Sequence, residues 1–435
     1  MGGGTLQLSS YGGQDIETIG NPQMTFFKSV YKRHTNFAIE TIEQNLEGSI
    51  TNNESKVTCI INKNGDLIHR SFLDIKFPEF PKFGDDLDKY TNWTNGTGYA
   101  YIKEVSLFIG DLLIDKHISE WFDIWNELTD NNNDEHLLVN KNYAKNNTLK
   151  SNTGSNCKPL QCYIPLHFWF NRFIGSALPL LALQYHDVKL QFVLRDLRHL
   201  INTNYNEVAA APTQIPSVKL FVDYIFLDAP ERKQFAEKSH EYLIEQVQFK
   251  KDTLNTSNNI NFNHPVKELI WAVRNKNVGK ESTTNVNAVA NAVKNNSSST
   301  NTMGDGNDYF NYSTLNFNTS RTEFVGGFSS NEPFEKAVVS FNGIDRFSKQ
   351  KASYFRTIQP LTYHSKVPRK HIYNYSFCIK PESLQPSGSC NFSRMQDCSL
   401  NFDNITPDDS ELFVFAKNYN VLVIHAGMGG LKYSN

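Results

Sequence analysis

Cysteine and long hydrophobic runs are scarce in this sequence. Six cysteines in 435 residues are too few for a disulfide-stapled scaffold, so we expect reduced thiols. The longest mostly apolar run, Ser176–Leu183, is far shorter than the roughly 20 residues that span a bilayer. No apolar stretch near the amino terminus has the pattern of a signal peptide. We therefore expect a cytosolic origin and no membrane-spanning segment.

An excess of charge of one sign is also missing. The chain has 43 Lys and Arg residues against 45 Asp and Glu residues, and both signs are spread along its length. Proteins that bind nucleic acid directly neutralise many phosphates with a field of basic side chains. The charge distribution therefore predicts no direct contact with nucleic acid.

The motifs of common enzymes do not occur. The sequence has neither a phosphate-binding Gly-x-x-x-x-Gly-Lys-Ser/Thr loop nor a Gly-x-Ser-x-Gly elbow. Its twelve histidines include no His-x-His pair and no His-Glu-x-x-His helix. The spacings Cys157-x4-Cys162 and Cys390-x7-Cys398 do not suit a zinc knuckle and favour buried free thiols. We predict no enzyme, no cofactor and no metal site.

One pair of residues resembles part of a catalytic dyad. Tyr185-His186-Asp187 places an acid beside a histidine, but neighbours on a strand point to opposite faces of the sheet. The better interpretation is a packed histidine or one in a turn.

What the sequence does contain is a series of short segments rich in β-branched and aromatic residues, which are typical of strands in packed antiparallel sheets. The clearest are Lys56–Ile61, Phe72–Phe77, Val188–Leu194, Lys219–Leu227 and Leu412–Ile424. Two asparagine-rich stretches, 130–156 and 275–331, predict long loops, because asparagine favours turns. The predicted fold class is all-β.

Helix signals are few. Asn21-Pro22 before Phe26, Phe27 and Tyr31 predicts one helix, with asparagine as its cap. Apolar residues at helical spacing across Ile118–Leu128 predict a second. The charged segment Pro230–Lys238 predicts a third, which we interpret as the connector between two domains.

The sequence repeats itself at low identity. Val105–Gly110 followed by Trp121-Phe122 corresponds to Val338–Gly343 followed by Tyr354-Phe355, at an offset of 233 residues. Two further matches occur in the same order: Asn36–Gln44 with Glu241–Phe249, and Phe221–Leu227 with Tyr419–Ile424. Three ordered matches favour a tandem duplication of two β-sandwich domains of about 200 residues each.

Candidate modification and sugar-binding positions are weak. Asn-x-Ser/Thr sequons in loop-like stretches make these residues candidate glycosylation sites: Asn92, Asn95, Asn295, Asn296, Asn311 and Asn318. An asparagine-rich chain produces such sequons by composition alone. The aromatic clusters His167–Phe170 and Tyr373–Phe377 could stack on sugars or bases, but in a β-rich chain they favour core packing.

Several segments resemble one protein family. Gly20–Ala38 (GNPQMTFFKSVYKRHTNFA) resembles the amino-terminal signature of major capsid proteins of nucleocytoplasmic large DNA viruses, nearest to the chlorella-virus type. Further family-like segments follow in order: Asp115–His117, Ala177–Leu190, Val222–Asp228, His240–Gln246, Asn261–Pro265, Gln385–Arg394, Ala416–Leu422 and Gly427–Leu431. The resemblance spans essentially the whole chain except the two asparagine-rich loops.

The resemblance implies a fold and an assembly. It implies two tandem eight-stranded jelly-roll β-sandwiches with a few short helices: an arm over 1–25, a first jelly roll over 26–228, a connector over 229–240 and a second jelly roll over 241–435. It further implies a homotrimer that forms a pseudo-hexagonal capsomer and tiles an icosahedral shell. The expected location is the virion, assembled in the host cytoplasm. Expected partners are neighbouring capsomers and minor capsid and penton proteins, with an internal virion membrane in indirect apposition.

Two alternatives remain open from sequence. Jelly rolls also serve as carbohydrate-binding proteins, and a minor or vertex capsid paralogue would share the same segments. We also expect the glycine-containing arm to lie on the inner face of the capsid, where it can order on other proteins.

Overall fold

The computed structural model describes residues 2–10, 12–80, 91–129, 138–139, 158–203, 214–276, 309–312, 332–405 and 410–433. The chain divides into two compact units, Met1–Phe37 and Ala38–Asn435.

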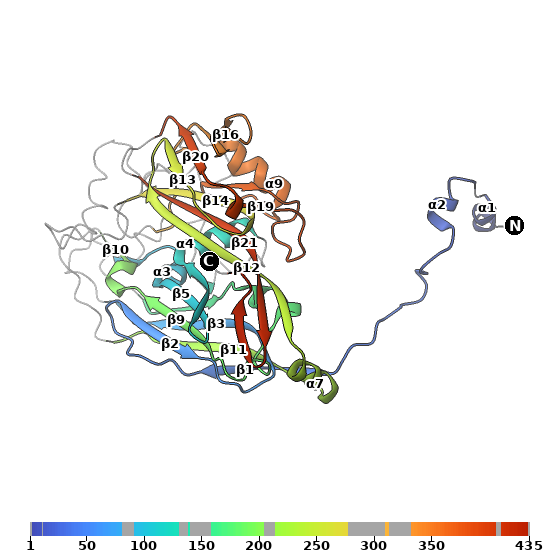
Figure 1. Cartoon of the computed structure of the whole chain (residues 1–435), viewed down its shortest axis with the longest axis horizontal. Helices are drawn as coiled ribbons and strands as arrows, with labels where there is room; N and C mark the ends of the chain where they lie inside the picture. The colour runs from blue at the N-terminus through green and yellow to red at the C-terminus, as the bar shows by residue number, and fades with distance from the viewer. Residues whose placement is uncertain are drawn as a thin grey trace. The chain divides into compact units, whose positions relative to one another are not determined.

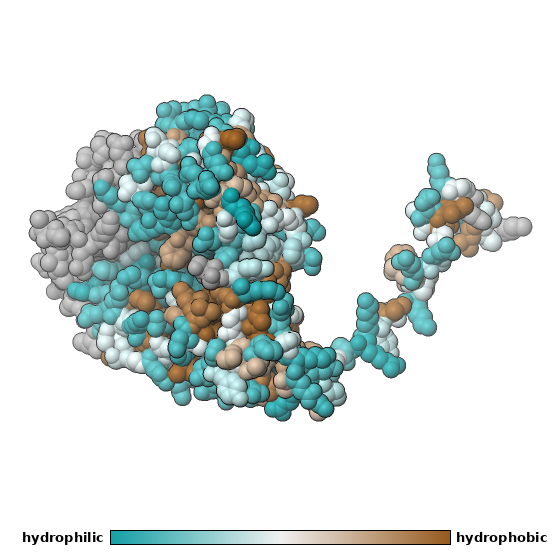
Figure 2. Space-filling model, in the orientation of Figure 1, coloured by the Kyte–Doolittle hydropathy of each residue, from teal (hydrophilic) through white to brown (hydrophobic). Residues whose placement is uncertain are grey.

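The N-terminal unit contains two short helices, α1 (Gly3–Ser9) and α2 (Ile16–Ile19). The prediction of a helix after Asn21-Pro22 is wrong, because residues 21–36 form turns and irregular backbone. Asn21, the predicted cap, has a positive φ of 48°, whereas a helix N-cap residue typically has a negative φ in the extended region. Phe26 and Phe27 are 88 % and 99 % exposed, so no packed face supports a helix there. Hydrophobic residues are visible on the surface of this unit in Figure 2.

The first half of the larger unit forms two antiparallel sheets. One has the order β1 (Phe37–Gln44), β11 (Ser217–Leu227), β3 (Leu67–Phe77), β7 (Leu160–Pro165), with β8 (Leu178–Pro179) also on β3. The other has the order β2 (Ser55–Ile60), β9 (Val188–Leu194), β5 (Ile102–Ile109), β6 (Leu112–Ile118). A separate pair joins β10 (Ile201–Thr203) to β4 (Thr91–Trp93).

The second half repeats this arrangement (Figure 1). Its first sheet has the order β12 (His240–Thr253), β21 (Ser410–His425), β14 (Pro265–Asn275), β18 (Ile372–Ser376), with β19 (Cys390–Asn391) and β22 (Met428–Leu431) at its margins. Its second sheet has the order β13 (Ser257–Asn259), β20 (Cys398–Asp403), β15 (Lys336–Phe341), β16 (Ile344–Asp345), with β17 (Gln350–Lys351) also on β15.

The two halves therefore have the same strand order, and each order is that of a jelly roll. The three sequence matches fall at equivalent places: β1 with β12, β5 with β15, and β11 with β21. Both β5 and β15 end in a tight turn that contains a glycine with positive φ, Gly110 at 62° and Gly343 at 77°. The predicted duplication and the all-β fold class are confirmed.

Helices occupy the connections. They are α3 (Thr97–Tyr101), α4 (Ser119–Leu128), α6 (Trp169–Arg172), α7 (Ala229–Glu237) and α9 (Gln359–Tyr363), the last continuing the π-helical segment η5 (Tyr354–Ile358). Short 3-10 turns are η2 (Ile174–Ser176), η3 (Leu197–Leu200) and η6 (Phe392–Arg394). The predicted helices at Ile118–Leu128 and Pro230–Lys238 are confirmed as α4 and α7. Asp228 caps α7 through its side chain, and Pro230 lies in its first turn.

The sheet that contains β14 and β21 is buried on both faces. Along β14, Leu269 and Trp271 enter the core of the second jelly roll, whereas Ile270 and Ala272 join the core that the first jelly roll supplies. On β21, Phe415 likewise lies in the first core. Alternate residues of a strand point to opposite faces, so the long apolar run of β21 reflects burial on both sides. The first jelly roll covers this sheet.

Other expectations about buried groups are confirmed. Cys59, Cys162, Cys378 and Cys398 are buried free thiols, Cys390 is partly buried, and Cys157 lies outside the described residues. His186 lies in irregular backbone before β9, with Nδ1 3.2 Å from the Gly429 amide. The aromatic clusters are core: Phe168, Trp169, Phe170 and Tyr373 are each at most 1 % exposed.

Candidate functional site

Helix α4 connects the two jelly rolls through an acidic stripe. Glu120, Asp123 and Glu127 are buried on this helix of the first jelly roll. The Lys370 Nζ lies 2.8 Å from each carboxylate oxygen of Asp123. The Arg274 guanidinium lies 2.8 Å from Glu120. Both cations belong to the second jelly roll, so each pair crosses the junction between the two domains.

The charge of Glu120 is stabilised by these contacts. Burial by itself would raise the pKa of the Glu120 carboxyl, but Arg274 and then Arg195 outweigh burial and hold this pKa below its usual value. The acid is therefore ionised when the domains are packed together. Removing one member of such a buried pair leaves the other charge without compensation.

The aromatic residues of α4 contact the same sheet of the second jelly roll. Trp121 lies 5.5 Å from Phe415, between ring centroids. The Trp125 ring is covered by two cations, Lys417 at 4.0 Å and Arg172 at 4.5 Å from its centroid. Cation–π contacts gain strength where water is excluded, and both tryptophans are at most 2 % exposed.

A buried carboxylate on β12 gathers three cations. Glu245 lies 2.7 Å from Arg172 and 3.1 Å from Lys417, and it accepts a short hydrogen bond from Lys267. Burial would raise the pKa of Glu245, but the three cations, Lys417 first, bring it below the usual value. Burial and then the nearby Arg172 lower the pKa of Lys417 to about 7. The cluster includes α6 of the first jelly roll through Arg172.

A histidine lies between two further carboxylates. His364 Nε2 is 2.7 Å from Glu268, and its Nδ1 is 3.1 Å from Glu382. Burial alone would lower the pKa of His364, but Glu268 outweighs burial, and the pKa rises to about 9. The ring lies 6.3 Å from Trp125, so this charged group also borders α4.

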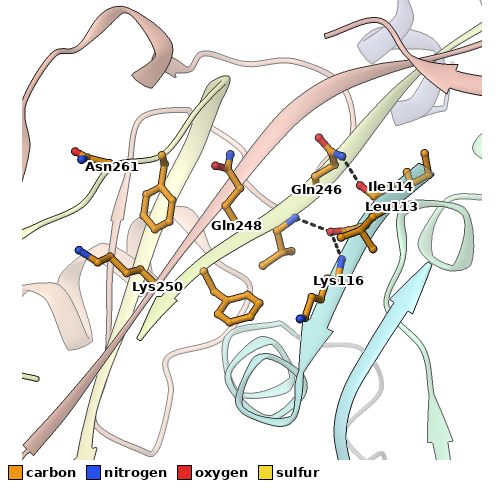
Figure 3. Close-up of a pocket in the computed structure, with 11 residues that line it drawn as sticks. Leu113, Ile114, Lys116, Gln246, Gln248, Lys250 and Asn261 are labelled. Atoms are coloured by element: carbon orange, nitrogen blue, oxygen red, sulfur yellow. Dashed lines mark hydrogen bonds between the residues drawn. The ribbon is translucent and has the colours of Figure 1, made fainter. Parts of the chain in front are cut away.

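A groove of about 330 Å³ runs beside the line where β6 meets β12. Figure 3 shows the contacts that join the two edge strands. The Gln246 side chain donates a hydrogen bond to the Ile114 carbonyl, and the Val247 amide donates to Asp115 at 3.1 Å. Lys116 and Lys250 border the groove. Side chains, not a continuous ladder, join the edges of the two sheets.

These contacts hold two domains in a fixed relation. Three ion pairs among the described residues join the two jelly rolls, and their side chains are buried or largely buried: Glu120–Arg274, Asp123–Lys370 and Arg172–Glu245. Within the described ranges, no group of three His, Cys, Asp or Glu residues could hold a metal ion. No helix in the same ranges is long and apolar enough to cross a membrane.

The structure places the candidate glycosylation residues unevenly. Asn95 is partly buried in a turn, and Asn92 lies on β4. Asn311 is only 2 % exposed, which leaves no room for a glycan on its amide in this conformation. Asn295, Asn296 and Asn318 lie outside the described residues.

The acidic stripe of α4 was not predicted. A signal for it was present, since positions 120, 123 and 127 share one face of a helix that also carries the aromatic residues Trp121, Phe122 and Trp125. The cationic partners at 274 and 370 are distant in sequence and gave no local signal.

Comparison with known proteins identifies the family. The sequence model of the family described as "Major capsid protein N-terminus" matches residues 25–228. The model of the family described as "Large eukaryotic DNA virus major capsid protein" matches residues 231–430. The chain is 38 % identical to the major capsid protein of Pyramimonas orientalis virus and 37 % identical to that of Paramecium bursaria Chlorella virus 1. Both alignments cover 100 % of each chain.

Solved structures agree with these relatives. The crystal structure of PBCV-1 VP54 superimposes with a TM-score of 0.74 at 33 % identity, covering 94 % of this chain and 100 % of that one. A chain of the quasi-atomic PBCV-1 virus capsid gives a TM-score of 0.73 at 34 % identity, with the same coverage. The fold class is thus two tandem jelly rolls, and the relatives are structural proteins of the capsid shell. The chain belongs to the family of major capsid proteins of large eukaryotic DNA viruses.

Proposed function

We propose that this chain acts in the capsid shell as a homotrimer, in which three copies form a pseudo-hexagonal capsomer. The observation that carries the proposal is the equal strand order of the two jelly rolls, joined by buried contacts through α4. Three chains with two similar domains each supply six similar towers around a threefold axis. Such a block can tile a flat lattice with neighbouring capsomers.

The mass of the purified protein in solution tests this proposal. Light scattering at micromolar concentration is expected to give three times the chain mass of 49.7 kDa. A stable monomer would contradict an obligate trimer. A glycan array on the same sample addresses the carbohydrate-binding alternative, which the buried aromatic clusters do not favour.

The domain organisation belongs to the same proposal. We assign an arm to 1–25, the first jelly roll to 26–228, the connector to 229–240 and the second jelly roll to 241–435. The exposed helix α7 (Ala229–Glu237) and the family matches at 25–228 and 231–430 support these limits. Limited proteolysis that cuts first within α7 would agree with them, and a first cut within a described β-strand would not.

The arm is assigned to contacts made during assembly. It exposes large hydrophobic side chains, among them Leu8, Ile16 and Met24. We propose that it orders on minor capsid or penton proteins, or on neighbouring capsomers, at the inner face of the shell. Deleting residues 2–25 is expected to leave the trimer intact and to impair shell assembly. Normal assembly of the deleted protein would refute this role.

Further assignments follow from the sequence and the relatives. We propose a non-enzymatic role, since the relatives are structural capsid proteins. The balanced charge supports a shell protein that does not contact nucleic acid directly. We also propose that an internal virion membrane lies only in indirect apposition to this protein. Assembly in the host cytoplasm agrees with the sparse cysteines. Of the six candidate glycosylation residues, Asn92 and Asn95 remain candidates in the described part of the chain, and the intact mass of virion-derived protein tests them.

A further inference from the structure

The two jelly rolls carry equivalent helical segments with unlike surroundings. Helix α4 follows the β5–β6 hairpin, and the segment Tyr354–Tyr363, formed by η5 and α9, follows the β15–β16 hairpin and β17. At the repeat offset of 233, Trp121 corresponds to Tyr354 and Trp125 to Ile358. The helical segment of the second jelly roll is therefore the duplicate of α4.

One face of each segment packs into its own jelly roll. Phe122 is fully buried beside Tyr99, with ring centroids 5.8 Å apart. Its counterpart Phe355 is fully buried beside Trp271 at 5.1 Å. The repeat therefore preserves the inward face of the helical segment.

The opposite faces differ. Trp125 of α4 is 1 % exposed, because the second jelly roll covers it. Its counterpart Ile358 is 49 % exposed, and Leu361, one turn further, is 69 % exposed. Figures 1 and 2 show the segment around α9 at the surface. The duplicate thus presents to solvent the positions that α4 buries against another jelly roll.

The surface that receives α4 also has a duplicate. In the second jelly roll, α4 packs on the outer face of the sheet where Phe415 pairs in register with Ile270. In the first jelly roll, Phe221 of β11 pairs in register with Phe72 of β3 in the equivalent sheet. The sequence repeat aligns Phe221 with Tyr419, which lies four residues along β21 from Phe415 and on the same face of that strand.

This second outer face carries an aromatic patch. The rings of Phe72 and Phe221 stack at 5.3 Å, and Tyr163 of β7 lies 6.4 Å from Phe72. Phe72 and Phe221 are half-buried, and Tyr163 is 39 % exposed. The aromatic patch formed by Phe72, Phe221 and Tyr163 therefore lies on the outer face of the sheet that is equivalent to the one on which the second jelly roll receives α4.

We propose that the segment Tyr354–Tyr363 of one chain packs on the aromatic patch of a second copy of this chain. This contact between chains is equivalent to the contact that α4 makes with the second jelly roll within one chain. The proposal rests on the trimer proposed above. A helix on one copy that meets a sheet on the next is a heterologous, head-to-tail contact, and a rotation of about 120° between copies closes such contacts into a ring of three. Three chains then make six similar helix-on-sheet contacts, alternately within and between chains.

The two kinds of contact differ in charge. The positions equivalent to Glu120, Asp123 and Glu127 are Ser353, Arg356 and Pro360. Arg356 is already paired with Glu332 of its own jelly roll at 3.0 Å. The contact between chains therefore lacks the acidic stripe of α4 and is mainly apolar. Its strength is expected to change little between low and high salt, because screening acts on charges.

A double substitution tests the contact. Ile358→Asp with Leu361→Asp places two charges at the proposed interface, where they would be desolvated without partners. Both side chains are exposed in the single chain, so the substitutions are expected to leave its fold intact. Met428→Asp is the matched control, because Met428 is 51 % exposed and lies on the C-terminal hairpin outside both faces. Near-UV circular dichroism and light scattering are measured on each protein.

The outcomes separate this contact from the trimer itself. A trimeric native protein and control, with a folded monomeric double variant, support the contact. A double variant that stays trimeric overturns the contact and leaves the trimer in place. A native protein that is monomeric or dimeric overturns both, because no closed ring of three then exists.

Cross-linking provides a second test that does not require a disrupted interface. Chains with Leu361→Cys are co-expressed with chains with Tyr163→Cys and treated with a short bis-maleimide. A covalent dimer is expected above the background of either single variant, since the described native thiols are mostly buried. Co-expressing Met428→Cys with Tyr163→Cys gives the control. A yield no higher than this control overturns the proposed contact.

Discussion

Replacing Glu245 by glutamine is expected to weaken the junction between the two jelly rolls severely. The glutamine keeps the shape of the side chain but removes the negative charge that Arg172, Lys417 and Lys267 surround. Glu245 is only 4 % exposed, so water cannot replace the lost charge. Breaking a buried ion pair by removing one partner costs about 3–5 kcal/mol. That loss is a large share of the roughly 5–15 kcal/mol by which folded proteins are stable.

The assay is urea unfolding at one fixed protein concentration, because assembly also contributes to apparent stability. Glu241→Gln is the matched control on the same strand. Glu241 pairs with Lys432 at 3.1 Å, and its side chain is 60 % exposed. Exposed pairs contribute about 1 kcal/mol at most. If Glu245→Gln lost no more stability than Glu241→Gln, the cluster around Glu245 would not stabilise the junction as argued.

The pH dependence of the same variant gives an independent check. Lys417 has a native pKa of about 7, far below that of an unfolded lysine. Removing the Glu245 charge lowers this pKa further, so the native variant binds fewer protons than the native wild type just below pH 7. Its stability then rises more steeply with pH in that range. The deficit caused by Glu245→Gln is therefore expected to be larger at pH 6 than at pH 8.

Three further predictions concern single positions. The charged form of His364 stabilises the fold below its unfolded pKa, and this contribution is lost as pH rises through about 9; the drop in unfolding midpoint between pH 7 and pH 10 should be smaller in His364→Gln. Gly427 has a φ of 81°, and an added Cβ would lie 2.6 Å from the Tyr185 ring. Gly427→Ala should therefore lower the free energy of unfolding, measured in urea, by about 1–3 kcal/mol. Gly430→Ala is the control: its added Cβ meets open space, and it should lower this free energy by less than about 1 kcal/mol. Trp125→Ala should lose about 3–5 kcal/mol in the same assay, because it removes a buried aromatic side chain; a loss below 1 kcal/mol would contradict its place in the junction.

The local pattern of the sequence predicted most of the elements. The segment Val188–Leu194 was predicted with the limits that β9 has, and Leu412–Ile424 lies within β21. Strands and amphipathic helices can be predicted from sequence because the alternation or helical spacing of apolar residues indicates which side chains face a core. The prediction of a helix after Asn21-Pro22 was wrong, because a capping residue and a few aromatic residues do not form a stable helix without a surface to pack on.

The candidate site could not be predicted in the same way. Trp121 and Trp125 were recognised as one face of a helix, but the sequence does not say which surface buries that face. Asp123 and Lys370 are 247 residues apart, and no local periodicity connects them. The same is true of Glu245 and Arg172, which are 73 residues apart and belong to different jelly rolls.

The sequence by itself determined the duplication, the all-β class and the family, because these depend on short segments whose order and composition can be compared directly. Only the tertiary structure decided that the sheet of β14 and β21 is buried on both faces and that α4 carries charges across the junction. It also decided that the duplicate helical segment leaves Ile358 and Leu361 exposed. The physical reason is that burial requires two surfaces in contact, whereas the local sequence of a strand or helix describes only the surface of that element.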